Sequence, residues 1–176
     1  GQKVGTVLNL SMTANITKKT QKIVVRNVLD KLPEIIQVDN FDVENDCKYD
    51  FVAIPVLLNG CIVGYTNDHM KTISKFLKLR RAQVINYEVS ISYDPVDKEI
   101  RIFCDEGRLI RPLLRLENNK MIIERKEKYD WNDLVKNSLV EFLDPSEIEF
   151  KVLAMTQKDL VIQQNDYCEI HPFVML

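Results

Sequence analysis

Residues 87–104 read YEVSISYDPVDKEIRIFC, and this stretch decides the predicted fold. Apolar and polar side chains alternate over residues 88–93 and again over residues 99–104, on either side of the turn sequence at residues 94–97. A period of two directs successive side chains to opposite faces of a strand. Proline and aspartate between two such runs are typical of a tight turn. The stretch therefore predicts an antiparallel hairpin with one apolar face.

Three further turn sequences extend this pattern along the chain. Asn59-Gly60 interrupts a β-branched run over residues 51–65, which is a strong hairpin signal. Asp105-Glu106-Gly107 follows the second strand of the opening stretch, and Gly107 can take the positive φ of such a turn. Asn118-Asn119 then precedes one more short run. We predict a mostly antiparallel sheet with a four-strand meander around residues 87–125.

Helical spacing predicts two or three helices beside this sheet. Apolar residues recur at intervals of three and four over residues 23–32 and again over residues 69–82. Asn67 or Asp68 can cap the second of these helices. A shorter helix is predicted over residues 129–139. The predicted fold class is therefore α+β.

The composition and net charge of the chain argue against two classes of protein, free-standing nucleic-acid binders and membrane proteins. The chain has 176 residues, 45% of them hydrophobic, and 24 Lys and Arg against 26 Asp and Glu give a net charge of −2. This balance argues against a free-standing nucleic-acid binder, which usually carries a strongly basic field. The longest apolar runs, such as residues 52–58, fall far short of the ~20 residues of a membrane span. We predict no membrane association and no signal peptide.

The four cysteines are scattered and contain no C-x-x-C pair. We interpret them as reduced, buried thiols of an intracellular protein. Cys168 and His171 are three residues apart, which leaves open a small thiol-dependent enzyme with Cys168 as nucleophile, or a metal pair. Structural packing is the favoured interpretation, because a C-x-x-H sequence supplies only two metal ligands.

No self-contained active site is visible in the sequence. The five glycines lack the spacing of a phosphate-binding loop. Asp105 and Glu106 are adjacent carboxylates, but neighbours in a turn usually point apart and stay solvated. His69, near a predicted helix start, is interpreted as a surface residue.

One predicted helix face is basic. Met70, Ile73, Phe76 and Leu77 form its apolar stripe, and the residues predicted on the opposite face or at the helix end are Lys71, Lys75, Lys78, Arg80 and Arg81. These cations are a candidate contact face for phosphates. A solvated helix face, with Arg80 and Arg81 complementing the helix dipole, explains the same pattern and is the more common arrangement.

Six short motifs, in order, resemble the second-largest subunit of multisubunit DNA-directed RNA polymerases. The first is GQKVGTVLNLS at residues 1–11, and the second is Asn59-Gly60 followed by Gly64. The third joins LRR at residues 79–81 to EVSI at residues 88–91. The remaining three are DEGRLIRPL at residues 105–113, VEFLD at residues 140–144 and CEIHP at residues 168–172. Together they cover essentially the whole chain.

The resemblance implies a scaffold part of a polymerase that carries out DNA-templated RNA synthesis. It implies a fork-adjacent segment at residues 1–50 and an external-domain α+β region at residues 51–176. The catalytic aspartates of this family lie in the largest subunit, so no catalytic or metal-binding residue is expected here, although the whole enzyme uses Mg. The implied partners are the largest subunit, the smaller subunits, the DNA template and the RNA.

Individual motif residues receive expected roles from the same resemblance. Gln2 and Lys3 are expected near nucleic acid, although Thr6 and Leu8 depart from the family pattern and remove one cation. The residues expected to have structural roles are Gly107, Arg108, Arg111, Pro112, His171 and Pro172. Arginine can hold carbonyls or carboxylates with its planar fork, and a proline at residue 172 favours an extended residue before it.

Short connections and the departures at Thr6 and Leu8 favour a divergent lineage such as a large DNA virus. The expected location is intracellular: the nucleus for a cellular eukaryotic enzyme, the host cytoplasm or virion for a cytoplasmic virus. Because the chain opens on Gly1 rather than methionine and stops at Leu176, we interpret it as an excised piece. The alternative function is a free-standing protein-interaction module that uses the acidic residues 39–50 and the basic helix face.

Overall fold

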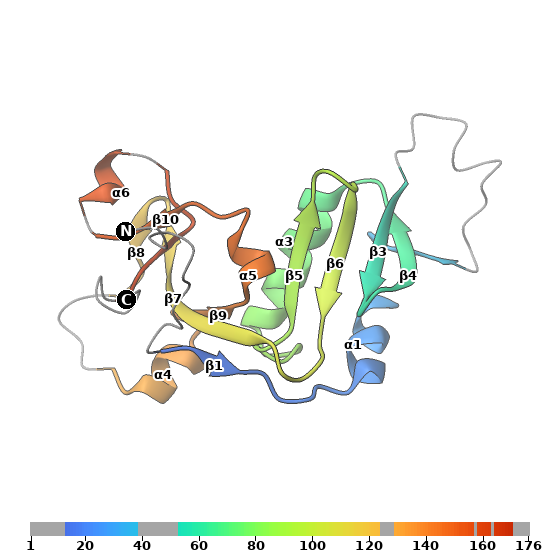
Figure 1. Ribbon diagram of the computed structural model, residues 1–176, viewed down its shortest axis with the longest axis horizontal. Helices are drawn as coiled ribbons and strands as arrows, with labels where there is room; N and C mark the ends of the chain where they lie inside the picture. Colours follow the sequence, from blue (N-terminus) through green and yellow to red (C-terminus); the bar gives the residue numbers. More distant parts are fainter. Residues whose placement is uncertain (1–12, 39–52, 124–128, 157, 163, 171–176) are drawn as a thin grey trace, which may run out of the picture. The chain divides into compact units, whose positions relative to one another are not determined.

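The computed structural model describes residues 13–38, 53–123, 129–156, 158–162 and 164–170 (Figure 1). The chain divides into two compact units, Thr17–Arg108 and a second unit that joins Gly1–Ile16 to Leu109–Leu176. We call them the 17–108 unit and the 109–176 unit and describe each by itself. These units are defined by contacts within the chain. The family-based division at residue 50 stays a prediction.

The 17–108 unit contains a five-stranded sheet with strand order β2-β4-β3-β6-β5. Its strands are β2 (Ile36–Gln37), β3 (Ile54–Leu58), β4 (Cys61–Thr66), β5 (Ser90–Asp94) and β6 (Glu99–Phe103). All neighbouring pairs are antiparallel except β3 and β6, which run parallel. The helices of this unit are α1 (Lys22–Leu29) and α3 (His69–Arg81). Both predicted hairpins are confirmed, and the Asn59-Gly60 turn has positive φ at both residues, 48° and 77°.

The predicted helix over residues 69–82 is confirmed as α3. Asp68 caps it, because its carboxylate accepts a hydrogen bond from the Lys71 backbone N–H at 3.0 Å. Phe76 of its apolar stripe is fully buried, and Ile73 and Leu77 pack beside it. Met70 was predicted in the same stripe but is 68% exposed. It lies in the first turn of the helix, before the helix reaches the apolar cluster.

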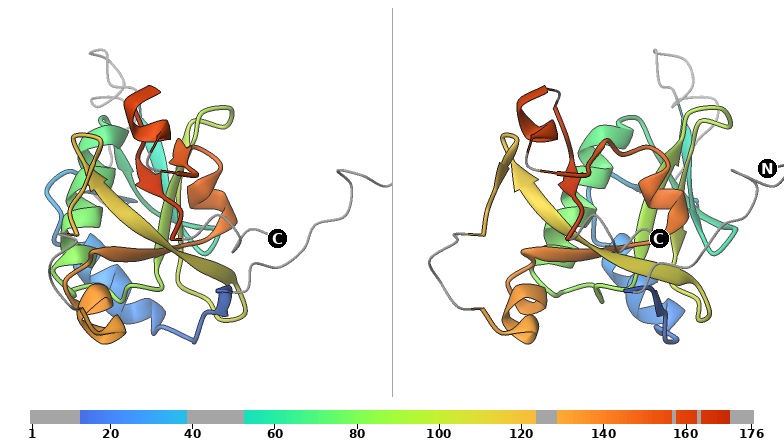
Figure 2. Two further views of the ribbon diagram at one scale, coloured as in Figure 1. Left: turned by 90° about the vertical axis from the view of Figure 1, so that its left-hand side faces the viewer. Right: turned by 60° about the vertical axis from the view of Figure 1, so that its left-hand side comes forward.

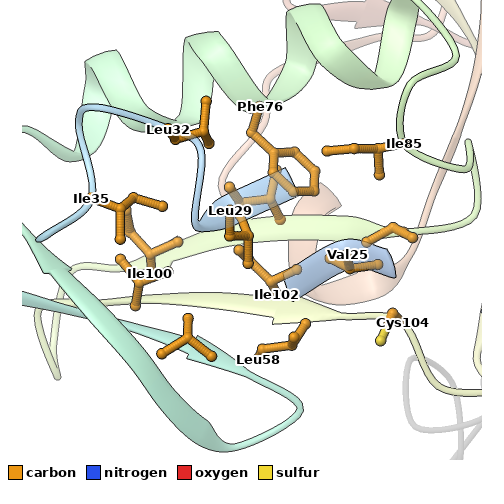
Figure 3. Packing of buried hydrophobic residues seen from close by; sticks show 14 of the residues in the cluster. Val25, Leu29, Leu32, Ile35, Leu58, Phe76, Ile85, Ile100, Ile102 and Cys104 are labelled. Carbon is orange, nitrogen blue, oxygen red and sulfur yellow. The ribbon is translucent and has the colours of Figure 1, made fainter. Parts of the chain in front are cut away.

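The core of this unit forms where α1 and α3 pack against the sheet (Figure 3). Leu29 of α1 lies below Phe76 of α3, and Ile102 of β6 lies below Leu29; Val25 of α1 and Ile100 of β6 belong to the same cluster (Figure 3). All five are at most 1% exposed. Burying aliphatic and aromatic side chains contributes roughly 1.5–3 kcal/mol for each residue. This cluster is therefore the main source of stability in the unit.

The predicted four-strand meander is wrong in its topology, although the α+β class and the mostly antiparallel pairing are confirmed. The strand after the turn at Gly107, β7 (Leu109–Glu117), pairs in the other sheet. The reason is that β6 lies between β3 and β5, so neither of its edges is free for a further strand. Gly107 does take a positive φ of 86°, but its turn leads out of the sheet.

In the 109–176 unit, β7 is the long central strand, drawn in yellow in Figure 2. Its partners are β1 (Asn15–Ile16), β8 (Lys120–Met121), β9 (Val140–Leu143) and β11 (Tyr167–Cys168), all antiparallel to it. A short strand, β10 (Leu153–Ala154), runs parallel to β11. Leu114 pairs with both Val140 and Cys168, so β9 and β11 lie on opposite edges of β7.

Three short helices complete this unit: α4 (Trp131–Lys136), α5 (Pro145–Ile148) and α6 (Asp159–Ile162). The described residues thus contain five helices, two or three of which were predicted. The additional two have four residues each, too few for a helical period to show in the sequence. No helix in the described ranges is long and apolar enough to cross a membrane.

Candidate functional site

Two of the predicted motifs meet around the guanidinium group of Arg108. Its Nη2 donates to the Glu88 backbone O at 2.8 Å, and its Nη1 donates to Ser90 Oγ at 2.9 Å. Its Nε lies 2.8 Å from Asp105 Oδ1 as an ion pair. Glu88 and Ser90 belong to the EVSI motif and Asp105 to the DEGR motif. The arginine therefore holds one motif against the other, as its planar fork allows.

Thr17 closes the same network from a third part of the chain. Its Oγ1 donates to the Asp105 backbone O at 3.0 Å, and the same oxygen accepts from the Arg108 backbone N–H at 3.0 Å. The next residue, Lys18, donates its backbone N–H to Glu88 Oε2 at 2.7 Å. Glu88 and Ser90 are 5% and 2% exposed, although strand alternation predicts a solvated polar face there. These hydrogen bonds account for their burial.

The LRR motif joins this part of the fold through Arg80. Its side chain was predicted at the end of the basic face of α3, but the residue is only 4% exposed. Its Nη1 donates to the Val89 backbone O at 3.1 Å. Arg80 therefore does not share the exposed face of the lysines. Because the buried Arg80 donates a charge-assisted hydrogen bond to a backbone carbonyl, it helps to hold α3 against the EVSI segment.

The remaining basic residues of α3 lie at its surface. Lys75 Nζ is 3.5 Å and Lys71 Nζ 4.0 Å from Oε1 of Glu34, whose side chain is 7% exposed. Lys78 is exposed and Arg81 is half-buried. A carboxylate of the same unit thus neutralises part of the charge on the predicted contact face. The role of this face in binding phosphates stays a prediction.

In the 109–176 unit, the RPL and CEIHP motifs meet as a buried ion pair. Arg111 Nη1 donates to Glu169 Oε1 at 2.5 Å, and the two side chains are 18% and 1% exposed. Pro112, the next residue of the motif, is buried in β7 opposite Phe142. The structural roles expected of Arg111 and Pro112 therefore have a definite geometry, since Arg111 connects β7 to the segment that follows β11.

The VEFLD motif joins the same strand. Glu141 lies opposite Leu113 in the β7–β9 register, and its Oε2 accepts a hydrogen bond of 2.9 Å from the Tyr167 hydroxyl. Both residues are buried. Asp144 at the end of the motif caps α5, because its Oδ1 accepts from the Glu147 backbone N–H at 2.9 Å. Four of the expected residues, Gln2, Lys3, His171 and Pro172, lie outside the described residues.

Two of the described thiols are buried and one is not. Cys104 and Cys168 are 1% exposed, and burial raises the pKa of both thiols. A raised pKa lowers the thiolate fraction, so the proposed nucleophilic use of Cys168 finds no support. Cys61 was expected to be buried but is exposed at the start of β4, where the burial pattern of the hairpin begins with solvent-facing residues. Cys47 lies outside the described residues.

Comparison with known proteins identifies the family. Residues 56–117 match the family described as RNA polymerase Rpb2, domain 4, and residues 131–172 match RNA polymerase Rpb2, domain 5. The chain belongs to the second-largest-subunit family of RNA polymerases. The two matched segments include five of the six predicted motifs in full, all but the one at residues 1–11.

Individual relatives of the second-largest-subunit family match along the whole chain. The DNA-directed RNA polymerase II subunit RPB2 of Encephalitozoon cuniculi is 32% identical over 192 residues, which cover 100% of this chain and 16% of the relative. A probable RPB2 homolog of Invertebrate iridescent virus 6 is 29% identical and again covers 100% of this chain and 15% of the relative. The chain thus spans about a sixth of the length of these relatives. A viral lineage stays a prediction, because cellular and viral relatives match at similar identity.

Several residues that bind motif residues are ones to which the sequence assigned no role. Glu169 and Glu141 stand inside motifs of the second-largest-subunit family, but a glutamate in a strand is usually solvent-exposed. Thr17 lies outside every motif. A charged residue between apolar neighbours, as in Tyr167-Cys168-Glu169-Ile170, is the signal that could have indicated a buried partner.

Proposed function

We propose that this chain is a scaffold segment of the second-largest subunit of a DNA-directed RNA polymerase. It contributes to DNA-templated RNA synthesis by building and positioning part of the subunit, without carrying the catalytic metal site. The observation that carries the proposal is the consecutive match to domains 4 and 5 of the Rpb2 family, at residues 56–117 and 131–172.

The contacts of the motif residues support a structural role for this segment. Arg80, Arg108 and Arg111 each bind a carbonyl, hydroxyl or carboxylate of the chain itself. Groups engaged in this way are not free to contact a substrate. The chemistry that these residues perform is the fixing of strands and turns to one another through charge-assisted hydrogen bonds.

The metal ion of the whole enzyme is assigned to another part of the assembly. The described residues contain no group of three or more His, Cys, Asp or Glu side chains arranged to hold a metal ion. Magnesium prefers oxygen ligands in octahedral geometry and is usually held by one or two carboxylates together with waters and phosphates. We propose, from the family resemblance, that the Mg a polymerase uses for nucleotidyl transfer is bound by residues elsewhere in the assembly.

The partners and location follow from the same proposal. The largest subunit and the smaller subunits would contact this segment, and DNA and RNA would be reached through the whole complex. Gln2 and Lys3 remain proposed neighbours of nucleic acid, and Lys71, Lys75, Lys78 and Arg81 a proposed contact face. The proposed compartment is that of the polymerase, which is the nucleus for a cellular eukaryotic enzyme and the host cytoplasm or virion for a viral one.

Co-purification of the tagged parent protein tests the proposal. We expect a homologue of the largest polymerase subunit to be captured, and the captured complex to synthesise RNA on a DNA template. The 176-residue chain alone is expected to show no nucleotidyl transfer. Capture without any polymerase subunit would contradict the proposal, and so would template-dependent RNA synthesis by the chain alone.

A further inference from the structure

A row of cations lies at the surface of the 17–108 unit, where the chain enters α1. The row consists of Lys18, Lys19, Lys22 and Arg26, and all four are exposed. Residues 13–29 contain no acidic residue. Lys22 and Arg26 are four residues apart in α1 and so lie on one side of it. We call these four residues the α1 basic row.

The lysines of this row have no acidic side chain as a partner among the described residues, whereas Lys71 and Lys75 of α3 share Glu34. Arg26 lies 4.0 Å from Asp30, at the outer limit of an ion pair. Two carboxylates next to the row are already bound. Glu88 accepts from the backbone N–H of Lys18, and Asp105 pairs with Arg108. Glu106, on the same turn as Asp105, is exposed.

The backbone under the row is fixed although the side chains are exposed. Thr17 N–H donates to the Arg108 O at 2.9 Å, and Thr20 N–H donates to the Cys104 O at 3.3 Å. Val25 and Leu29 anchor α1, since each is 1% exposed in the core. The first turn of α1 contains no acidic residue, so the positive end of the helix dipole adds to the field of the lysines. The backbone that carries these four cations is therefore fixed.

We propose that the α1 basic row is a contact surface for the phosphate backbone of a nucleic acid. Exposed lysine and arginine side chains bind phosphates by releasing condensed counterions, and such contacts need no base recognition. The choice of nucleic acid over an acidic protein rests on the proposed function, because a polymerase encloses DNA and RNA. The net charge of −2 of the chain does not oppose this, since the charge is concentrated locally.

Binding of a fluorescent 30-base-pair DNA duplex to the 176-residue chain, measured over a series of salt concentrations, tests the proposal. The test variant is Lys18→Gln, Lys19→Gln, Lys22→Gln. The matched control is Lys98→Gln, Lys120→Gln, Lys158→Gln, which removes the same charge from other exposed positions. Thermal unfolding of both variants verifies that each is folded. A poly-glutamate peptide serves as the competing acidic probe.

We expect the test variant to lose most of the affinity for DNA at low salt. The slope of log K against log salt concentration should fall in magnitude by about 2 to 3, because each lost phosphate contact removes about 0.9. The control variant should change the DNA affinity and the salt-dependence slope much less. Equal loss in the two variants, no measurable DNA binding by the parent chain, or tighter binding of poly-glutamate than of DNA would each overturn the proposal. The measurement needs no polymerase, so its failure leaves the proposed function standing, and the co-purification experiment tests the proposed function separately.

Discussion

Arg111 and Glu169 show how the contribution of an ion pair to folding stability depends on its burial. Arg111 lies on β7, and so does Arg115, whose Nη2 is 3.0 Å from Glu117. Glu169 has a side chain that is 1% exposed, whereas that of Glu117 is 66% exposed. A pair in solvent is screened and adds little. Removal of one partner from a buried pair leaves an uncompensated charge in a poorly solvated place.

We predict that Glu169→Gln lowers the free energy of unfolding by about 3 kcal/mol, because it leaves the Arg111 charge without its carboxylate. Glu117→Gln is the matched control and should change the same quantity by less than about 1 kcal/mol. Urea unfolding of the two variants measures the difference. Equal effects of the two substitutions would contradict the importance assigned to burial.

The thiols make a second prediction at the scale of single residues. Burial raises the pKa of Cys104 and of Cys168, so at a given pH each holds less thiolate than an ordinary cysteine. We expect iodoacetamide at pH 8 to modify the exposed Cys61 before Cys104 and Cys168, and these two buried thiols only as the fold opens. Peptide mass spectrometry resolves the sites. Labelling of Cys168 before Cys61 would contradict this prediction and would support Cys168 as a reactive nucleophile.

At the scale of elements, Gly64 fixes how closely β2 approaches β4. A Cβ at residue 64 would lie 2.6 Å from the Ile36 backbone O and 2.6 Å from Ile35 Cγ2. Gly107 differs, because a Cβ there meets nothing within 4 Å and only its positive φ disfavours a side chain. The two glycines thus serve different needs, close approach in one case and turn conformation in the other.

We predict that Gly64→Ala destabilises the chain by about 2–3 kcal/mol, because β2 must move away from β4. Gly107→Ala should cost about 1 kcal/mol, and Gly107→Asn less, since asparagine tolerates the left-handed conformation. Thermal unfolding ranks the three variants. A Gly64→Ala variant as stable as the parent chain would show that β2 does not hold this register.

The elements themselves were largely predictable, and the way they combine was not. Alternation at residues 87–104 and the Asn59-Gly60 turn indicated both hairpins, because these signals are local in the chain. The parallel pairing of β3 with β6 joins Val56 to Ile100 across a long stretch of sequence and left no local signal. For this reason the predicted meander failed at Gly107. The buried partners Glu169 and Thr17 escaped prediction for the same reason.

At the scale of the whole molecule, the account holds that the motif residues build the segment and perform no chemistry. Two units each carry their own hydrogen-bonded motif network, around Arg108 and around Arg111. If these networks only shape the segment, damage to them should reduce how much polymerase assembles. The turnover of each complex that does assemble should stay unchanged.

The most direct test is RNA synthesis by polymerase purified with the parent subunit carrying Arg108→Ala or Arg111→Ala. The amount of assembled complex and the rate of nucleotide addition for each complex are measured separately, with the exposed Lys120→Ala as control. The account predicts a several-fold lower yield of complex for both arginine variants and an unchanged rate for each complex. An unchanged yield together with a rate reduced tenfold or more would contradict it.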